Sequence, residues 1–146
     1  MADIKPVTDR FAVSGQIRPE EVAELGRRFA LIVNNRPDGE DADQPAAADI
    51  DAAARDAGVN YVHIPVRGEA TAEQIRQMRV ALSSVRGEAL AFCRSGTRSI
   101  TTWALGEGLA GHPVEDLEAK ARSAGYNIGP ALGNRLPTLR AEQDAG

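Results

Sequence analysis

The sequence predicts a three-layer α/β domain in which helices flank a mostly parallel sheet of about four or five strands. Short apolar segments alternate along the chain with longer segments of helical periodicity. Two of the apolar segments, residues 29–33 and 89–92, contain no charged side chain. Such runs are typical of strands buried on both faces of a parallel sheet. At 146 residues, the chain can bury about two-thirds of its unfolded surface as one domain, so we expect a single domain over 1–146.

The first half of the chain carries the patterns of three strands and two helices. The strands are expected over residues 11–13, 29–33 and 60–64. Pro19, followed by two glutamates, marks a helix start, because proline fits a first helical turn and acids favour its positive end. The apolar face of this helix is expected to contain Val22, Leu25 and Phe29. A second, alanine-rich helix over 46–57 should end at Gly58.

The middle of the chain continues with a helix, a strand and a further helix. Thr71 and Gln74 have the spacing of a capping box, which predicts a helix from there to about residue 85. The next strand is expected over 89–92. After a glycine-containing loop, Ile100 and Trp103 recur at helical spacing.

The C-terminal part is expected to be helical but interrupted. A helix over 114–124 should end at Gly125, and the glycines and proline of 129–133 predict a flexible connection. One last short helix is expected to begin at Leu136, and the tail over about 140–146 is expected to fray.

The charge and residue usage exclude several classes of function. The net charge is −4 and no block of basic residues occurs, so we expect no nucleic-acid binding and no membrane binding. One cysteine cannot form an intrachain disulfide, and the N-terminus lacks the apolar region of a signal peptide, so we expect a cytoplasmic location. His63 and His112 lie far apart in sequence, so we expect no metal, and no other cofactor.

The strongest functional signal is Cys93, which directly follows an apolar strand. The loop after it consists of Arg94, Ser95, Gly96, Thr97, Arg98 and Ser99. A strand, a tight loop and a helix in this order place backbone N–H groups around an anion site. This field, with arginines nearby, favours the thiolate, which is the nucleophilic form. The alternative is a small buried hydrophobic side chain, the commonest role of a free cysteine.

A second group of candidate site residues follows the strand at 29–33. Arg36, Asp38 and Glu40 lie in the turn-rich segment 34–40, and loops at strand ends carry the chemistry of α/β sheets. We expect Arg36 to orient an anionic substrate and Asp38 to hold Arg36 or Arg98 in place. Simple turn formation is the alternative. Ser99 is expected either to donate a hydrogen bond to the thiolate or to cap the following helix.

Three segments, 13–17, 34–40 and 92–99, together resemble the beta-lactamase-hydrolase-like family of small phosphatase-like domains. The resemblance covers about residues 8–110. It implies the fold of cysteine-dependent phosphatases. Members of that family occur alone or fused to a metallo-β-lactamase-type sulfur dioxygenase. The resemblance therefore implies a sulfur dioxygenase as a possible partner and a link to sulfur transfer.

The length of the cysteine loop bears on the chemistry. Tyrosine and dual-specificity phosphatases have five residues between cysteine and arginine, whereas Arg98 comes one position earlier. This spacing resembles the loop of rhodanese-type sulfurtransferases. In dual-specificity phosphatases, an aspartate that follows the strand corresponding to residues 61–66 acts as the general acid. This chain has Glu69 there and no aspartate, so either Glu69 or Asp38 could take the role of the acid.

These two differences lead us to expect a sulfurtransferase. Cys93 would form a persulfide with a small anionic donor, such as thiosulfate or a low-molecular-weight persulfide, and would pass the sulfur to an external acceptor thiol. The first alternative is a phosphatase that works through a phosphocysteine, with Arg98 binding the phosphoryl oxygens. The second is a non-catalytic module that binds anions.

Overall fold

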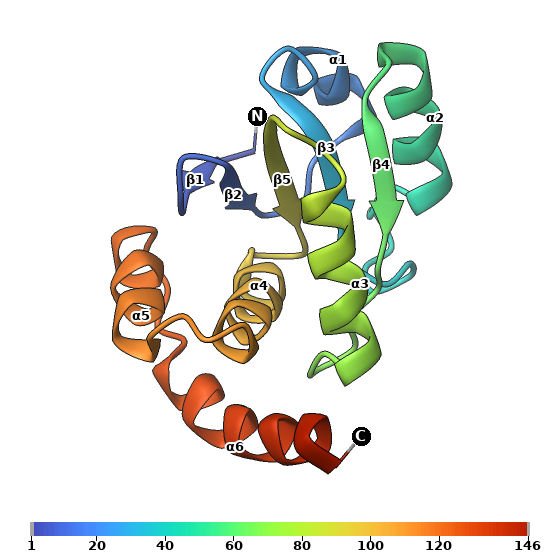
Figure 1. Cartoon of the computed structure of the whole chain (residues 1–146). Coiled ribbons are helices and arrows are strands. Elements are labelled where there is room, and N and C mark those ends of the chain that lie inside the picture. Colours follow the sequence, from blue (N-terminus) through green and yellow to red (C-terminus); the bar gives the residue numbers. More distant parts are fainter. Residues whose placement is uncertain (1, 146) are drawn as a thin grey trace.

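The computed structural model describes residues 2–145, which form a five-stranded sheet flanked by helices (Figure 1). The strands are β1 (Lys5–Pro6), β2 (Phe11–Ser14), β3 (Phe29–Asn34), β4 (Asn60–His63) and β5 (Glu88–Phe92). The helices are the 3₁₀ turn η1 (Pro19–Glu21), α1 (Val22–Leu25), α2 (Ala47–Ala57), α3 (Ala72–Ser83), α4 (Thr97–Leu109), α5 (Val114–Ser123) and α6 (Gly129–Ala145).

The strand order is β1-β2-β5-β3-β4, with β5 at the centre. Strands β2, β5, β3 and β4 run parallel, and β1 pairs antiparallel with β2. The predicted class, a mostly parallel α/β sheet, is thus confirmed. The two-residue strand β1 was not predicted, because two residues are too few to show a period in the sequence.

Two hydrophobic cores lie on the two faces of the sheet. Helices α1 and α2 cover one face, and α3, α4, α5 and α6 lie on the other (Figure 1). Neighbouring residues of one strand alternate between the cores: Ala12 packs with the α1 and α2 side, and Val13 with the opposite side. This alternation explains why the stretches 11–13, 29–33 and 89–92 are apolar at every position.

Several predicted helix boundaries agree with the structure. Helix α2 ends at Ala57, directly before Gly58, which has a φ of 72°, and the capping box of Thr71 and Gln74 is present at the start of α3. The first predicted helix is only a 3₁₀ turn and one α-helical turn, which ends at Leu25. Phe29 belongs to β3 rather than to that helix.

The prediction of an interrupted C-terminus is wrong. Residues 129–145 form one helix, with Pro137 inside it. Pro130 is tolerated because it lies in the first turn, where no intrahelical donor is needed. Leu132, Leu136 and Leu139 are buried against the core, and this packing outweighs the low helix propensity of glycine and proline. The segment expected to fray is the last part of α6 up to Ala145, and residue 146 lies outside the described residues.

The parallel strands end in one row. Phe92 of β5 is in register with Ser14 of β2 and with Asn34 of β3, and Asn34 is in register with His63 of β4. The loops that leave these four strands therefore begin side by side at the same edge of the sheet.

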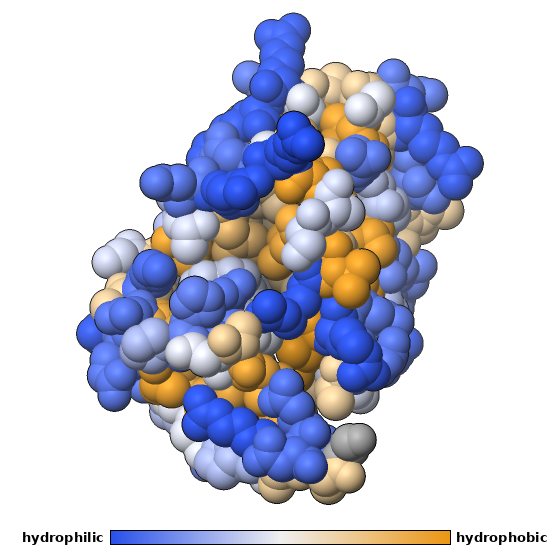
Figure 2. Space-filling view, in the orientation of Figure 1, coloured by the Kyte–Doolittle hydropathy of each residue, from blue (hydrophilic) through white to orange (hydrophobic). Residues whose placement is uncertain are grey.

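The surface in the orientation of Figure 1 is mostly hydrophilic, with smaller hydrophobic areas between the helices (Figure 2). No helix within residues 2–145 combines the length and the apolar character that a membrane crossing requires.

Candidate active site

Backbone hydrogen bonds join the loops at this edge of the sheet. The Asn35 N–H donates to the Phe92 carbonyl at 2.8 Å, and the Gln16 N–H donates to the Arg94 carbonyl at 3.4 Å. Gly15 allows the segment after β2 to lie this close to Arg94, because a Cβ at position 15 would lie 2.9 Å from the Arg94 carbonyl oxygen. The loops after β2, β3 and β5 thus form one connected rim.

Cys93 lies at the base of this rim, directly after β5, and is 1% exposed. The Gly96 N–H donates to its Sγ at 3.1 Å. Helix α4 begins at Thr97, so its first N–H groups have no carbonyl acceptor one turn earlier in the helix. Partial positive charge on such N–H groups favours an anion placed next to them.

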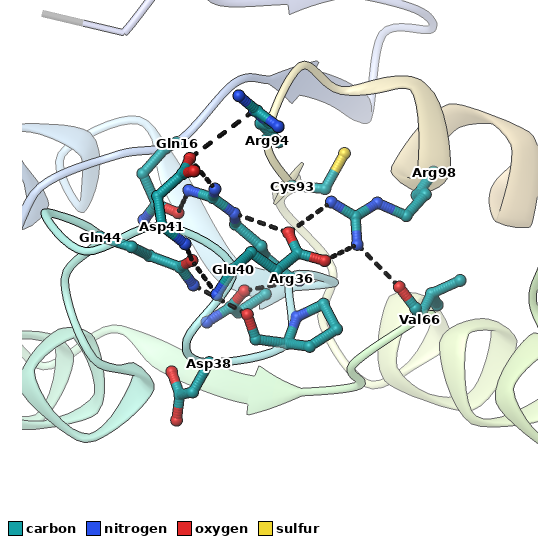
Figure 3. A network of polar contacts seen from close by, with 12 residues as sticks. Gln16, Arg36, Asp38, Glu40, Asp41, Gln44, Val66, Cys93, Arg94 and Arg98 are labelled. Atoms are coloured by element: carbon teal, nitrogen blue, oxygen red, sulfur yellow. Dashed lines mark hydrogen bonds and ion pairs between the residues drawn. The ribbon is translucent and has the colours of Figure 1, made fainter. Parts of the chain in front are cut away.

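The Arg98 guanidinium is hydrogen-bonded along one side, and its other side faces Cys93 (Figure 3). Its Nη1 donates to Glu40 Oε2 at 2.8 Å and to the Val66 carbonyl at 2.9 Å, and its Nη2 donates to Glu40 Oε1 at 2.8 Å. A guanidinium has five N–H groups, so the Nε–H and one Nη2–H remain. The Cys93 sulfur lies on the side of the guanidinium turned away from Glu40 (Figure 3). The hydrogen bonds to Glu40 raise the pKa of Arg98, and the charge on Cys93 acts in the same direction.

Glu40 is in turn fixed by a second arginine. Arg36 Nε donates to Glu40 Oε1 at 2.9 Å, while its Nη1 donates to Gln16 at 3.0 Å and its Nη2 to Asp41 at 2.7 Å (Figure 3). The hydrogen bonds from Arg98 lower the pKa of Glu40 to about 2, and the one from Arg36 adds to this effect against the opposing effect of burial. The carboxylate therefore stays charged at neutral pH.

Arg36 does not orient a substrate as expected from the sequence. It is 3% exposed, and its three nitrogens are bound to Gln16, Glu40 and Asp41. Its role is to support Glu40, which supports Arg98.

Asp38 also differs from the expectation. Its side chain points away from the Cys93 loop (Figure 3), and its Oδ1 accepts a hydrogen bond from the Ala47 N–H at 2.8 Å. Ala47 is the first residue of α2, so Asp38 satisfies a helix N-terminus rather than holding Arg36 or Arg98. The carboxylate that holds both arginines belongs to Glu40, two residues later.

The remaining loop residues lie in different surroundings. The Arg94 side chain is 68% exposed and pairs with Asp41 at 3.7 Å. The hydroxyls of Ser95 and Thr97 are 3.2 Å apart in an exposed position. The Ser99 hydroxyl is buried and has no hydrogen-bond partner among the described residues, so in this conformation it neither caps α4 nor reaches Cys93.

Four contributions to the site were not predicted from the sequence: Gln16, Asp41, the carbonyl of Val66, and Tyr126, whose hydroxyl donates to the Ser95 carbonyl at 2.7 Å. Asp41 could have been found, because it directly follows the candidate Glu40. Tyr126 gave no signal, because it lies between α5 and α6 and far along the chain from Cys93.

Comparison with known proteins identifies relatives of the whole domain. Residues 3–110 match the family model of the beta-lactamase hydrolase-like protein, phosphatase-like domain. A beta-lactamase hydrolase-like protein of Xylella fastidiosa is 36% identical over 132 residues, which cover 88% of this chain and 31% of that protein. The chain therefore spans about a third of the length of this relative.

Solved structures show the same fold. A candidate phosphatase from Neisseria meningitidis is 29% identical, with a TM-score of 0.78 over 94% of this chain and 98% of that one. The core catalytic domain of a PP-IP phosphatase from S. cerevisiae is 12% identical, with a TM-score of 0.65 over 97% of this chain and 91% of that one. The second similarity concerns the fold alone.

These comparisons overturn the expectation of a sulfurtransferase that works through a persulfide. The matching family model is that of a phosphatase-like domain, and the similar structure from Neisseria meningitidis is described as a candidate phosphatase. The shorter cysteine loop does not keep Arg98 away from the sulfur. Arg98 comes one position early in the sequence, but its long side chain, held by Glu40, still turns two N–H groups toward Cys93.

Proposed function

The chain belongs to the beta-lactamase hydrolase-like family with a phosphatase-like domain, and on this premise we propose that it is a cysteine-dependent phosphatase acting on phosphate monoesters. One observation carries the proposal. The Arg98 guanidinium is fixed by Glu40 so that its Nε–H and one Nη2–H are directed to the side of the Cys93 sulfur. A pair of parallel N–H groups matches two oxygens of a phosphoryl group.

The rest of the cradle supports the same chemistry. The Gly96 N–H points at the sulfur, and the start of α4 at Thr97 adds N–H groups with partial positive charge. A phosphoryl group seated there would meet donors on several sides. Such donors stabilise the negative charge on the equatorial oxygens of the transition state.

The reaction proceeds in two steps that use this geometry. The Cys93 thiolate attacks phosphorus, the bond from phosphorus to the ester oxygen breaks, and the alcohol leaves with a proton. Water then attacks the phosphocysteine, the S–P bond breaks, and inorganic phosphate and the thiolate are released. The Arg98 fork holds the phosphoryl oxygens through both steps.

We further propose Glu69 as the group that protonates the leaving oxygen. Glu69 and Arg98 line one cleft of about 180 Å³ beside the cysteine loop, whereas Asp38 is bound to the start of α2. A general acid matters most when the leaving group is a poor one. Glu69→Gln should therefore slow hydrolysis of an alkyl phosphate much more than hydrolysis of p-nitrophenyl phosphate.

The test of the main proposal combines turnover with trapping of the intermediate. Wild-type protein should hydrolyse p-nitrophenyl phosphate, and rapid acid quenching should trap one phosphoryl group on Cys93, located by mass spectrometry. Cys93→Ser should abolish both. Arg98→Lys keeps the charge but not the fork, and should reduce kcat/KM by about 10²–10³-fold.

Arg94→Lys is the matched control, because Arg94 is exposed and pairs with Asp41 instead of facing the sulfur. It should change kcat/KM by less than about threefold. Equal losses in the two arginine variants, or turnover that survives in Cys93→Ser, would contradict the proposal.

A further inference from the structure

We propose that Tyr126, outside the segment matched by the family model, is a positioning residue that sets the reactivity of Cys93 through the Ser95–Gly96 peptide. The hydroxyl of Tyr126 donates to the Ser95 carbonyl at 2.7 Å. Tyr126 lies between α5 and α6, and the family match ends at residue 110. The inference rests on the proposed function only where it concerns turnover, because the effect of Tyr126 on the reactivity of the Cys93 thiol is measured separately.

One rigid peptide links the tyrosine to the nucleophile. The Gly96 N–H, which donates to Cys93 Sγ at 3.1 Å, belongs to the same peptide plane as the Ser95 carbonyl. The peptide is trans, so its C=O and N–H point in opposite directions. Tyr126 therefore holds one end of a plane whose other end is aimed at the sulfur.

Gly96 fits this arrangement in two ways. Its φ of 96° is disfavoured for residues with a side chain. A Cβ at this position would also lie 2.2 Å from the Tyr126 hydroxyl oxygen and 3.0 Å from its Cζ. The absence of a side chain thus lets the tyrosine ring lie directly against the loop, where it blocks rotation of the peptide.

The charges around the sulfur agree with a donor role for the tyrosine. Burial raises the pKa of Tyr126, and the charge on Cys93 and that on Asp3 raise it further, so the phenol keeps its proton at neutral pH. A hydrogen bond to the Ser95 carbonyl polarises the peptide and strengthens its N–H as a donor.

The experiment compares Tyr126→Phe with the control Tyr61→Phe. Tyr61 is the other tyrosine of the chain. Its hydroxyl forms hydrogen bonds with Asn34 and the Ala47 carbonyl, and none with the cysteine loop. Cys93 is the only cysteine, so alkylation by iodoacetamide reports on it alone. Between pH 5 and pH 10, Tyr126→Phe should shift the alkylation profile to higher pH. On the rising part of the profile the rate should fall roughly three- to tenfold, and the alkaline plateau should stay within twofold. Tyr61→Phe should follow the wild type.

Turnover provides the second measurement. Tyr126→Phe should lower kcat for p-nitrophenyl phosphate with KM within about twofold, because the oxygens are still held by Arg98. An alkylation profile identical to that of the wild type would overturn the inference. An alkylation rate lowered by the same factor at every pH, together with a lowered melting temperature, would also overturn it. A shifted profile in a protein without phosphatase activity would support the positioning role and refute the proposed function.

Discussion

Replacing Glu40 with glutamine tests the network that holds Arg98. The carboxylate accepts two hydrogen bonds from Arg98 and one from Arg36. Glutamine has nearly the same shape, but it is neutral and has only one acceptor oxygen. The variant therefore leaves the packing in place and removes the charge between the two arginines.

The size of the effect follows from the pKa of Glu40. Its fall from 4.5 to about 2 in the folded protein corresponds to roughly 3 kcal/mol of stabilisation. This is an upper limit, because the side chain is 27% exposed. The folded pKa lies below the unfolded one, so the stabilisation is complete above about pH 5 and is lost as the pH falls toward 2. At pH 3.5 about 1 kcal/mol of it should be gone.

Urea unfolding at pH 7 and pH 3.5 measures this contribution. The free energy of unfolding of Glu40→Gln should lie below that of the wild type by up to roughly 3 kcal/mol at pH 7, and the gap should narrow by about 1 kcal/mol at pH 3.5. Glu24→Gln, at an exposed position on α1, controls for the general effect of removing a carboxylate. A gap of the same size at both pH values would refute the reasoning, since it would mean that the charge of Glu40 contributes nothing.

Three further substitutions separate support of the site from chemistry. Arg36→Ala should lower the free energy of unfolding by about 3 kcal/mol, since it leaves Glu40 without one of its partners, and a change confined to KM would contradict this. Asp38→Ala should cost about 1 kcal/mol in urea unfolding through the start of α2. The kcat/KM of this variant for p-nitrophenyl phosphate should equal that of the wild type. A kcat/KM lowered by more than about threefold would contradict this role for Asp38. Gly96→Ala should reduce kcat by at least about tenfold, because the added Cβ collides with Tyr126; full activity would show that the loop tolerates another shape.

The class of fold is contained in local patterns of the sequence. Segments 29–33 and 89–92 are apolar at every position, which a strand needs when both of its faces are buried. The capping box of Thr71 and Gln74 and the glycine after α2 are also local, and both are present in the structure. The C-terminus was predicted wrongly, because burial of Leu132, Leu136 and Leu139 outweighs the local preferences of glycine and proline.

The sequence by itself therefore determined the α/β class and the position of Cys93 between a central strand and a loop that leads into a helix. Only the tertiary structure decided which side chains serve that loop. Glu40 rather than Asp38 holds Arg98, and Tyr126 reaches the Ser95 carbonyl from another part of the chain. The reason is physical. A strand–loop–helix pattern depends on residues that are neighbours in the sequence. The direction of a side chain in a turn depends on how the strands pair in register and how the helices pack, and so do contacts between distant segments.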